Sequence, residues 1–275
     1  MIRLWISEWE RLWSRRITWI LFFSIPLVLW VTGKYYLGKN AHLSPSSPEF
    51  TVMDNFPTMA LAEQLITFFN VVVLMLLVFS ITEEYGTGQL RLIILRACSF
   101  RQIFFAKWLA VMGTVGLFQV AYFLESYLIG AWMFPFTGRT RLFLHAGWAS
   151  SGQAFSYHIR YYLIAFATLV VISAVMMFFA VISSTTTTAM GLSVGFLMIS
   201  IAYPYVLFVF TRGLNPPLSP KWFFLSLTHI QYQGIARMLA EKPDFVGWNF
   251  AIMAVYGVFF TVMAYGIFTR QDRFF

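Results

Sequence analysis

The residues best suited to chemistry gather in one charged stretch, residues 83–107, which separates two long apolar segments. It opens with the carboxylates of Glu83 and Glu84 and continues with the cations of Arg91, Arg96 and Arg101. Such groups suit charged contacts with a second protein. Anchoring of two helix ends at lipid headgroups is the alternative. The chain has no local Ser-His-Asp pattern, so we expect the charged stretch to bind rather than to catalyse.

The composition is that of an integral membrane protein. Of the 275 residues, 59% are hydrophobic, 20% aromatic and only 11% charged, whereas a soluble domain is roughly 45–50% apolar and about 25% charged. The net charge of +8 does not indicate nucleic-acid binding, because the basic residues are scattered at the ends of apolar segments. The single cysteine, Cys98, excludes an intramolecular disulfide.

Six apolar segments are long enough to cross a bilayer, which needs roughly 20 residues of helix. They are residues 17–37, 61–81, 104–134, 159–183, 189–210 and 248–268. No small-x-small cleavage pattern follows the first, which predicts an uncleaved span rather than a signal peptide. Residues 1–16 place tryptophans at helical spacing, which favours an interfacial helix, with a frayed start to the first span as the alternative. The sequence thus predicts one all-α transmembrane domain, residues 1–275.

The segments between the spans carry turn formers. Three prolines argue against regular structure in residues 38–57, and the hydroxyl tract 183–188 is long enough only for a tight turn between antiparallel helices. In residues 211–245, Ser219 and Pro220 form a helix cap and first position. This pattern predicts a short helix or re-entrant hairpin on the outer membrane surface.

Basic residues are denser on the side of the membrane that carries both termini and the charged stretch. Because lysine and arginine collect in cytoplasmic loops, we predict a plasma-membrane protein with both termini in the cytoplasm. The charged stretch is then a cytosolic hairpin between spans 2 and 3, and residues 211–245 are extracellular.

Glu125 is the one carboxylate well inside a predicted span, where an ionisable group is by default a functional candidate. Counted from Lys107 at the inner boundary, a rise of 1.5 Å per residue places it roughly 27 Å away, near the outer interface. A structural ion pair with Arg139, Arg141 or Arg160 and a role in an outer gate both remain open. A proton relay fits this depth poorly.

Gly191 and Gly195 form a G-x-x-x-G pattern in the fifth span. Small residues at this spacing let two helices approach closely. The contact could be with a second subunit or with another helix of the same chain.

The sequence predicts no metal and no directly bound cofactor. The four histidines lack a ligand spacing such as H-x-x-x-H; they are His42, His145, His158 and His229. No G-x-x-x-x-G-K-[ST] loop exists, because neither Gly-Lys pair is followed by the serine or threonine whose hydroxyl holds a metal. If ATP drives this protein, another chain binds it.

The order of residues in the charged stretch resembles the cytosolic loop between the second and third spans of ABC-2 type transporter permeases, including the bacitracin and lantibiotic exporter branch. The matching residues are Glu84, Tyr85, Gly88, Leu90, Arg91, Arg96, Ser99, Arg101 and Lys107. Gln89 departs from the pattern, because the family usually has threonine there. Six spans and an interfacial helix at the start are also similar to this family.

The resemblance implies a half-size permease that pairs with a second permease copy or paralogue and with two separate ATP-binding subunits, which hold ATP and magnesium. It implies that a set of residues couples the permease to the ATPase: Glu83, Glu84, Gly88, Leu90, Arg91, Arg96 and Arg101. A short amphipathic helix over residues 89–97 would be a suitable lever.

We therefore expect a transport subunit rather than an enzyme, belonging to an exporter that moves an amphipathic substrate. The candidate substrates are a peptide antibiotic, a lipid or a glycan precursor, and export of the first would confer antibiotic resistance or immunity. An ATP-independent channel or ion-coupled carrier is the alternative, and it would need ionisable residues at mid-bilayer.

Overall fold

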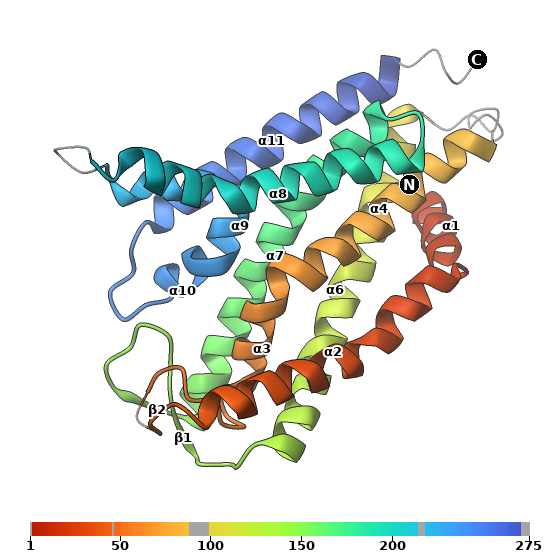
Figure 1. Cartoon of the computed structure of the whole chain (residues 1–275). Helices are drawn as coiled ribbons and strands as arrows, with labels where there is room; N and C mark the ends of the chain where they lie inside the picture. The colour runs from red at the N-terminus through yellow and green to blue at the C-terminus, as the bar shows by residue number, and fades with distance from the viewer. Residues whose placement is uncertain (1, 46, 88–98, 214–217, 271–275) are drawn as a thin grey trace.

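The chain forms six long helices in the computed structural model, which describes residues 2–45, 47–87, 99–213 and 218–270, with backbone alone over 83–87 (Figure 1). They are α2 (Arg16–Asn40), the continuous run of α3 (Phe56–Gln64), η1 (Leu65–Phe69) and α4 (Asn70–Thr87), then α6 (Phe100–Met133), α7 (Ser151–Ile182), α8 (Thr186–Thr211) and α11 (Val246–Arg270). All six are long and apolar enough to cross a membrane. This confirms the predicted all-α architecture with six helices of membrane-spanning length and composition.

The two ends of the bundle differ in what they carry. Both chain termini, the N-terminal helix α1 (Ile2–Trp13) and the turn between α7 and α8 lie toward one end (Figure 1). The short strands β1 (Arg139–Arg141) and β2 (Trp148–Ser150) lie at the opposite end. An even number of long helices returns the chain to the side on which it began.

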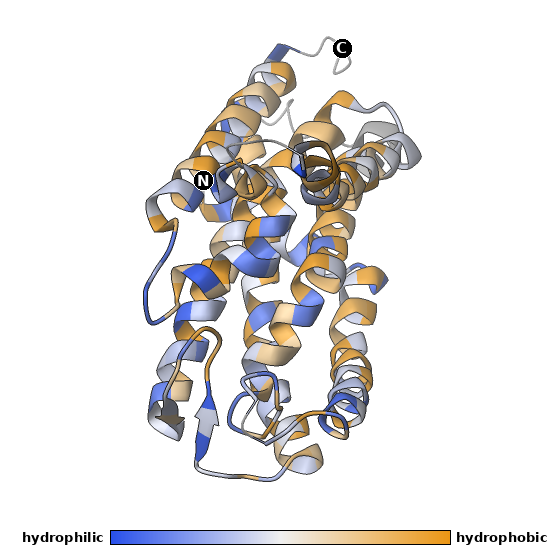
Figure 2. Ribbon diagram, turned by 60° about the vertical axis from the view of Figure 1, so that its left-hand side comes forward, coloured by the Kyte–Doolittle hydropathy of each residue, from blue (hydrophilic) through white to orange (hydrophobic). Residues whose placement is uncertain are grey.

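Helix α7 forms the centre of the bundle and packs against α4, α8 and α11. Aromatic side chains fill the core beside it, where the ring of Phe69 lies 5.5 Å from Phe118 and 5.0 Å from Tyr122. By contrast, only 22% of the α8 span and 11% of the α11 span are buried. Figure 2 shows hydrophobic residues along the long helices, and some of the large ones, such as Leu128 and Phe210, are exposed, as contact with lipid or with another subunit requires.

Several helices extend beyond their predicted ends because the chain supplies good caps. Helix α7 begins eight residues before the predicted position 159, at Ser151, where Ser150 and Gln153 form a reciprocal capping box. Helix α4 continues through Glu83 and Glu84 to Thr87, so these carboxylates lie on a helix and not in a turn. One helical glycine costs only about 1 kcal/mol relative to alanine, which is too little to end a long packed helix at Gly86.

A small β-hairpin was not predicted from the sequence. Strands β1 and β2 pair antiparallel within the loop between α6 and α7. The buried carboxylate of Asp54 ties this loop to the start of α7, because it accepts hydrogen bonds from the backbone of Thr137 and Gly138 and, at 2.7 Å, from the hydroxyl of Ser151.

Residues 218–245 contain the short helices η2 (Pro220–Leu225), α9 (Leu227–His229), η3 (Ile230–Gly234) and α10 (Ile235–Met238). The sequence predicted a short helix or re-entrant hairpin on the membrane surface. In the structure Leu227, Ile230 and Ile235 are buried, so the segment enters the bundle between its long helices. The hydroxyl of Ser226 donates a hydrogen bond of 2.6 Å to the Ser200 carbonyl of α8, which fixes its entry point.

Candidate functional site

A buried ion pair joins α1 to α6. The Nζ of Lys107 donates hydrogen bonds of 3.1 and 3.0 Å to the two carboxylate oxygens of Glu8. Lys107 is only 1% exposed and Glu8 only 3%. A buried ion pair contributes little over an apolar pair, but loss of one partner is strongly destabilising. The pair therefore fixes where α1 lies on the bundle.

The buried face of α1 matches only in part the face that tryptophan spacing predicts, since Trp5 and Trp13 are partly buried against the core. Leu4, Glu8 and Leu12 recur every four residues, and Glu8 and Leu12 are buried. Ile2 and Ile6 of the same helix are exposed. Lys107, predicted to mark the inner boundary of the third span, lies instead inside the bundle, because α6 begins at Phe100.

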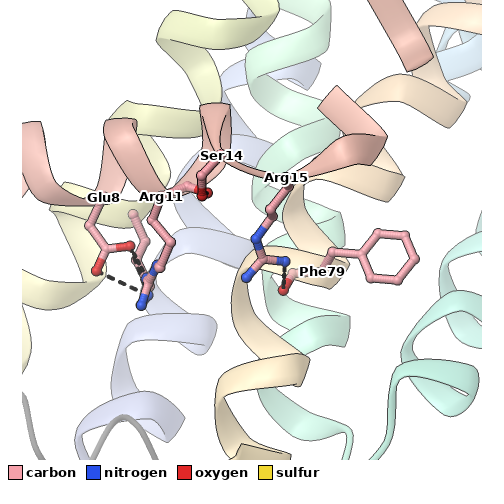
Figure 3. A network of polar contacts seen from close by, with 6 residues as sticks. Glu8, Arg11, Ser14, Arg15 and Phe79 are labelled. Atoms are coloured by element: carbon pink, nitrogen blue, oxygen red, sulfur yellow. Dashed lines mark hydrogen bonds and ion pairs between the residues drawn. The ribbon is translucent and has the colours of Figure 1, made fainter. Parts of the chain in front are cut away.

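A second contact ties the start of α2 to the last turns of α4. The guanidinium of Arg15 donates a hydrogen bond of 2.7 Å to the backbone carbonyl of Phe79, while Arg11 pairs with Glu8 (Figure 3). Phe79 comes four residues before Glu83, and Lys107 comes six residues after Arg101. The N-terminal segment thus holds both helices that adjoin residues 88–98.

Helix α6, which follows residues 88–98, begins with a reciprocal capping box. The hydroxyl of Ser99 accepts a hydrogen bond from the backbone N–H of Gln102, whose side chain accepts one from the Ser99 backbone. On the other side, the hydroxyls of Thr82 in α4 and Thr186 in α8 lie 2.9 Å apart. Movement at this end would therefore reach α8 through α4.

Some of the predicted coupling residues lie at the end of α4 or the start of α6, and the others lie within residues 88–98. Glu83 and Glu84 lie on the last turns of α4, and Arg101 is exposed in the first turn of α6. The remaining four lie outside the part of the chain that the structure describes; they are Gly88, Leu90, Arg91 and Arg96. The predicted helix over residues 89–97 lies outside it as well.

Glu125 lies half-buried on α6. Among the described residues it makes no ion pair or hydrogen bond, and its Oε2 atom is buried without a partner. The predicted pairing with Arg139, Arg141 or Arg160 is therefore not formed within the described part of the chain. The arginines belong to the loop and to α7, and the Glu125 side chain does not reach them.

Gly191 and Gly195 lie on an open face of α8. A Cβ atom added at either position would meet nothing within 4 Å. Packing against a helix of the same chain, one of the two alternatives, does not occur among the described residues. The face is free for lipid or for a second subunit, and Leu192 and Met198 are also exposed on α8.

A buried polar cluster inside the helical bundle was missed by sequence reasoning. Asn70 on α4 and Gln231 on η3 exchange two hydrogen bonds, of 2.8 and 3.0 Å, and both are fully buried. Gln231 also donates to the hydroxyl of Thr168 on α7, at 3.2 Å. Asn70 directly follows the π-helical turn η1, which packs against the π-helical turn η3. Such turns interrupt α-helices often at functional sites.

One family model matches most of the chain. It is described as a protein of unknown function (DUF2705), and it matches residues 20–274. The match includes five of the six long helices in full and α2 from its fifth residue onward, while α1 lies outside it. No curated protein matches the chain.

Proposed function

The chain belongs to the DUF2705 family, whose function is unknown, and from its architecture we propose that it is the permease subunit of an ATP-driven ABC exporter in the cytoplasmic membrane. The observation that carries the proposal is that Glu8 and Arg15 tie the N-terminal segment to both α6 and α4, on either side of residues 88–98. A force on that interval would move the N-terminal segment and both helices together. A membrane protein driven by a separate ATPase needs such a lever.

The proposal assigns each partner a place. Two ATP-binding subunits, which hold ATP and magnesium, contact the cytosolic ends of α4 and α6 through Glu83, Glu84 and Arg101. A second copy of the permease, or a paralogue, meets the open face of α8 at Gly191 and Gly195. Both termini are cytoplasmic, and an amphipathic substrate passes between the two permeases.

The proposal is tested first by purifying the tagged protein from its native host in a gentle detergent. We expect an ATP-binding subunit to remain bound. Glu84→Ala together with Arg101→Ala removes one charge of each sign. It is expected to lower both the retained ATPase and transport-dependent ATP hydrolysis by at least about tenfold, since a close charge pair across an interface is worth about 1.5 kcal/mol or more.

The matched control is Lys242→Ala with Asp244→Ala, which removes two exposed charges of opposite sign near the other end of the bundle. This control should bind the ATPase as the unaltered chain does. Unchanged ATPase binding and hydrolysis in the Glu84/Arg101 variant would contradict the proposed coupling site.

Contact between permeases gives a separate prediction. Gly191→Leu with Gly195→Leu places two large side chains where close helix approach is proposed, so the dimer fraction should fall several-fold. In-membrane crosslinking measures that fraction. Val209→Leu, an exchange at an exposed position of the same helix, is the control. A dimer that forms equally well with both leucines would place the interface elsewhere.

The channel or ion-coupled carrier is a second candidate, because the buried Oε2 of Glu125 has no partner among the described residues. A homo-oligomer that retains no ATPase under crosslinking would favour it. Glu125→Gln would then abolish ion flux, whereas in the exporter it should leave ATPase binding intact.

A further inference from the structure

A cavity of about 600 Å³ carries charges of both signs at the end of the bundle away from the termini. Helix α2 contributes Tyr36 and Lys39 to its wall, α3 contributes Glu63, and α10 contributes Arg237. Because it lies beside apolar spans, this cavity combines polar recognition groups with access to the membrane.

Two of these charges are neutralised within the chain and two are not. Lys39 pairs with Glu49 at 2.7 Å. The exposed carboxylate of Glu63 accepts only a long hydrogen bond, 3.4 Å, from the Tyr36 hydroxyl. The guanidinium of Arg237 lies 5.9 Å from the centre of the Phe224 ring and makes no ion pair or side-chain hydrogen bond with the described residues.

Two histidines lie at these spaces. His145 lines the cavity, with its Nδ1 atom 2.8 Å from the carbonyl oxygen of Phe143, and His229 lies beside it in the wall of an apolar groove. Burial, followed by the charge of Arg237, lowers the pKa of His229 below its usual value. The imidazole is therefore neutral at pH 7, where an unperturbed histidine is already mostly uncharged. Among the carboxylates, the lysine and the arginine that line the cavity, Glu63 is the anion and Arg237 the cation without an ion pair to the described residues.

An apolar groove of about 490 Å³ adjoins this cavity. Tyr232 and Gln233 of η3 line both spaces, so the two adjoin at these side chains. Ile201 and Phe208 form part of the groove wall on α8, and both are exposed on the lipid-accessible face of that helix. A hydrocarbon chain could enter the groove from the bilayer without crossing polar surface.

We propose that the charged cavity and the apolar groove together bind a zwitterionic phospholipid. The carboxylate of Glu63 accepts hydrogen bonds from the amine of the lipid head group, and the guanidinium of Arg237 donates hydrogen bonds to its phosphate. An acyl chain of the lipid lies in the groove against α8. A zwitterionic head group fits the cavity better than an anionic or a cationic one. An anionic head group would place a like charge near Glu63, and a cationic head group would place one near Arg237. The lipid site itself is independent of the proposed function. Only the step that makes this lipid the transported substrate rests on the proposed exporter.

The test measures lipid binding to the purified full-length chain, stripped of lipid in detergent, by native mass spectrometry. The probes are phosphatidylethanolamine, phosphatidylglycerol and a cationic lipid, all with the same acyl chains. We expect phosphatidylethanolamine to bind about tenfold more tightly than either of the others, as a charge-assisted hydrogen bond predicts.

Neutral substitutions should change this selectivity in opposite directions. Glu63→Gln should weaken phosphatidylethanolamine binding about tenfold and close the gap to the anionic lipid. Arg237→Gln should weaken it similarly and close the gap to the cationic lipid. The control, Lys242→Gln with Asp244→Asn, should change none of the three affinities.

Equal affinity for all three heads, or selectivity unchanged in both variants, would overturn the inference. Tighter binding of an amphipathic peptide that displaces the lipid would overturn the choice of ligand. Lipid binding is measured without an ATPase, so the two proposals can fail separately. If the chain shows no lipid selectivity but still co-purifies with an ATP-binding subunit, only the lipid site is contradicted. Loss of the ATPase with lipid selectivity intact would count against the exporter alone.

Discussion

Glu8→Leu is expected to destabilise the folded chain by about 3–5 kcal/mol, because it leaves the ammonium of Lys107 buried without the carboxylate that accepts two of its hydrogen bonds. Lys107→Met should cost less, since Arg11 remains beside Glu8. The double variant Glu8→Leu with Lys107→Met replaces the pair by apolar side chains and should recover to within about 1 kcal/mol of the unaltered chain.

Thermal unfolding of the purified chain in detergent measures these differences. The control is Glu10→Leu, because Glu10 lies on the same helix but is exposed and should change stability by no more than about 0.5 kcal/mol. If the double variant were as unstable as Glu8→Leu, the pair would not be what holds α1 in place. The apolar double variant also separates stability from coupling, because it keeps α1 docked without the charges.

The six spans could be predicted because a span is encoded locally. Each needs only a sufficient run of apolar residues, and residues 17–37 and 248–268 both meet that condition without reference to any other part of the chain. The ends of the helices were harder to predict. Ser150 begins α7 early by means of a cap formed with Gln153, and such a cap competes with tertiary packing that is not visible locally.

The polar contacts inside the bundle could not be predicted, because their partners lie far apart in the chain. Glu8 and Lys107 are separated by 99 residues, and Asn70 and Gln231 by 161. Glu8 has leucines four residues to either side, which signals a buried position, but nothing near it in the sequence indicates a lysine partner. The charged stretch was recognised for the opposite reason, since all of its residues are close together along the chain.

Gln231→Leu is expected to destabilise the chain by about 2 kcal/mol, because it leaves the buried amide of Asn70 without its reciprocal partner. Asn70→Leu should have a similar effect. The double variant should cost less than the sum of the two, with a coupling energy of about 1–2 kcal/mol, the upper range for polar pairs between membrane helices. Thr187→Leu, at an exposed position of α8 away from the cluster and the cavity, is the control.

The same variants test whether α4 transmits movement to η3. In the proposed exporter, ATPase closure acts on the cytosolic end of α4, and Asn70 connects that helix to the segment that borders the charged cavity. Gln231→Leu should therefore lower substrate transport more than ATP hydrolysis, measured together in reconstituted vesicles. Equal losses of both would mean that the amide pair only stabilises the fold, and that force reaches the outer end through α6 or α8 instead.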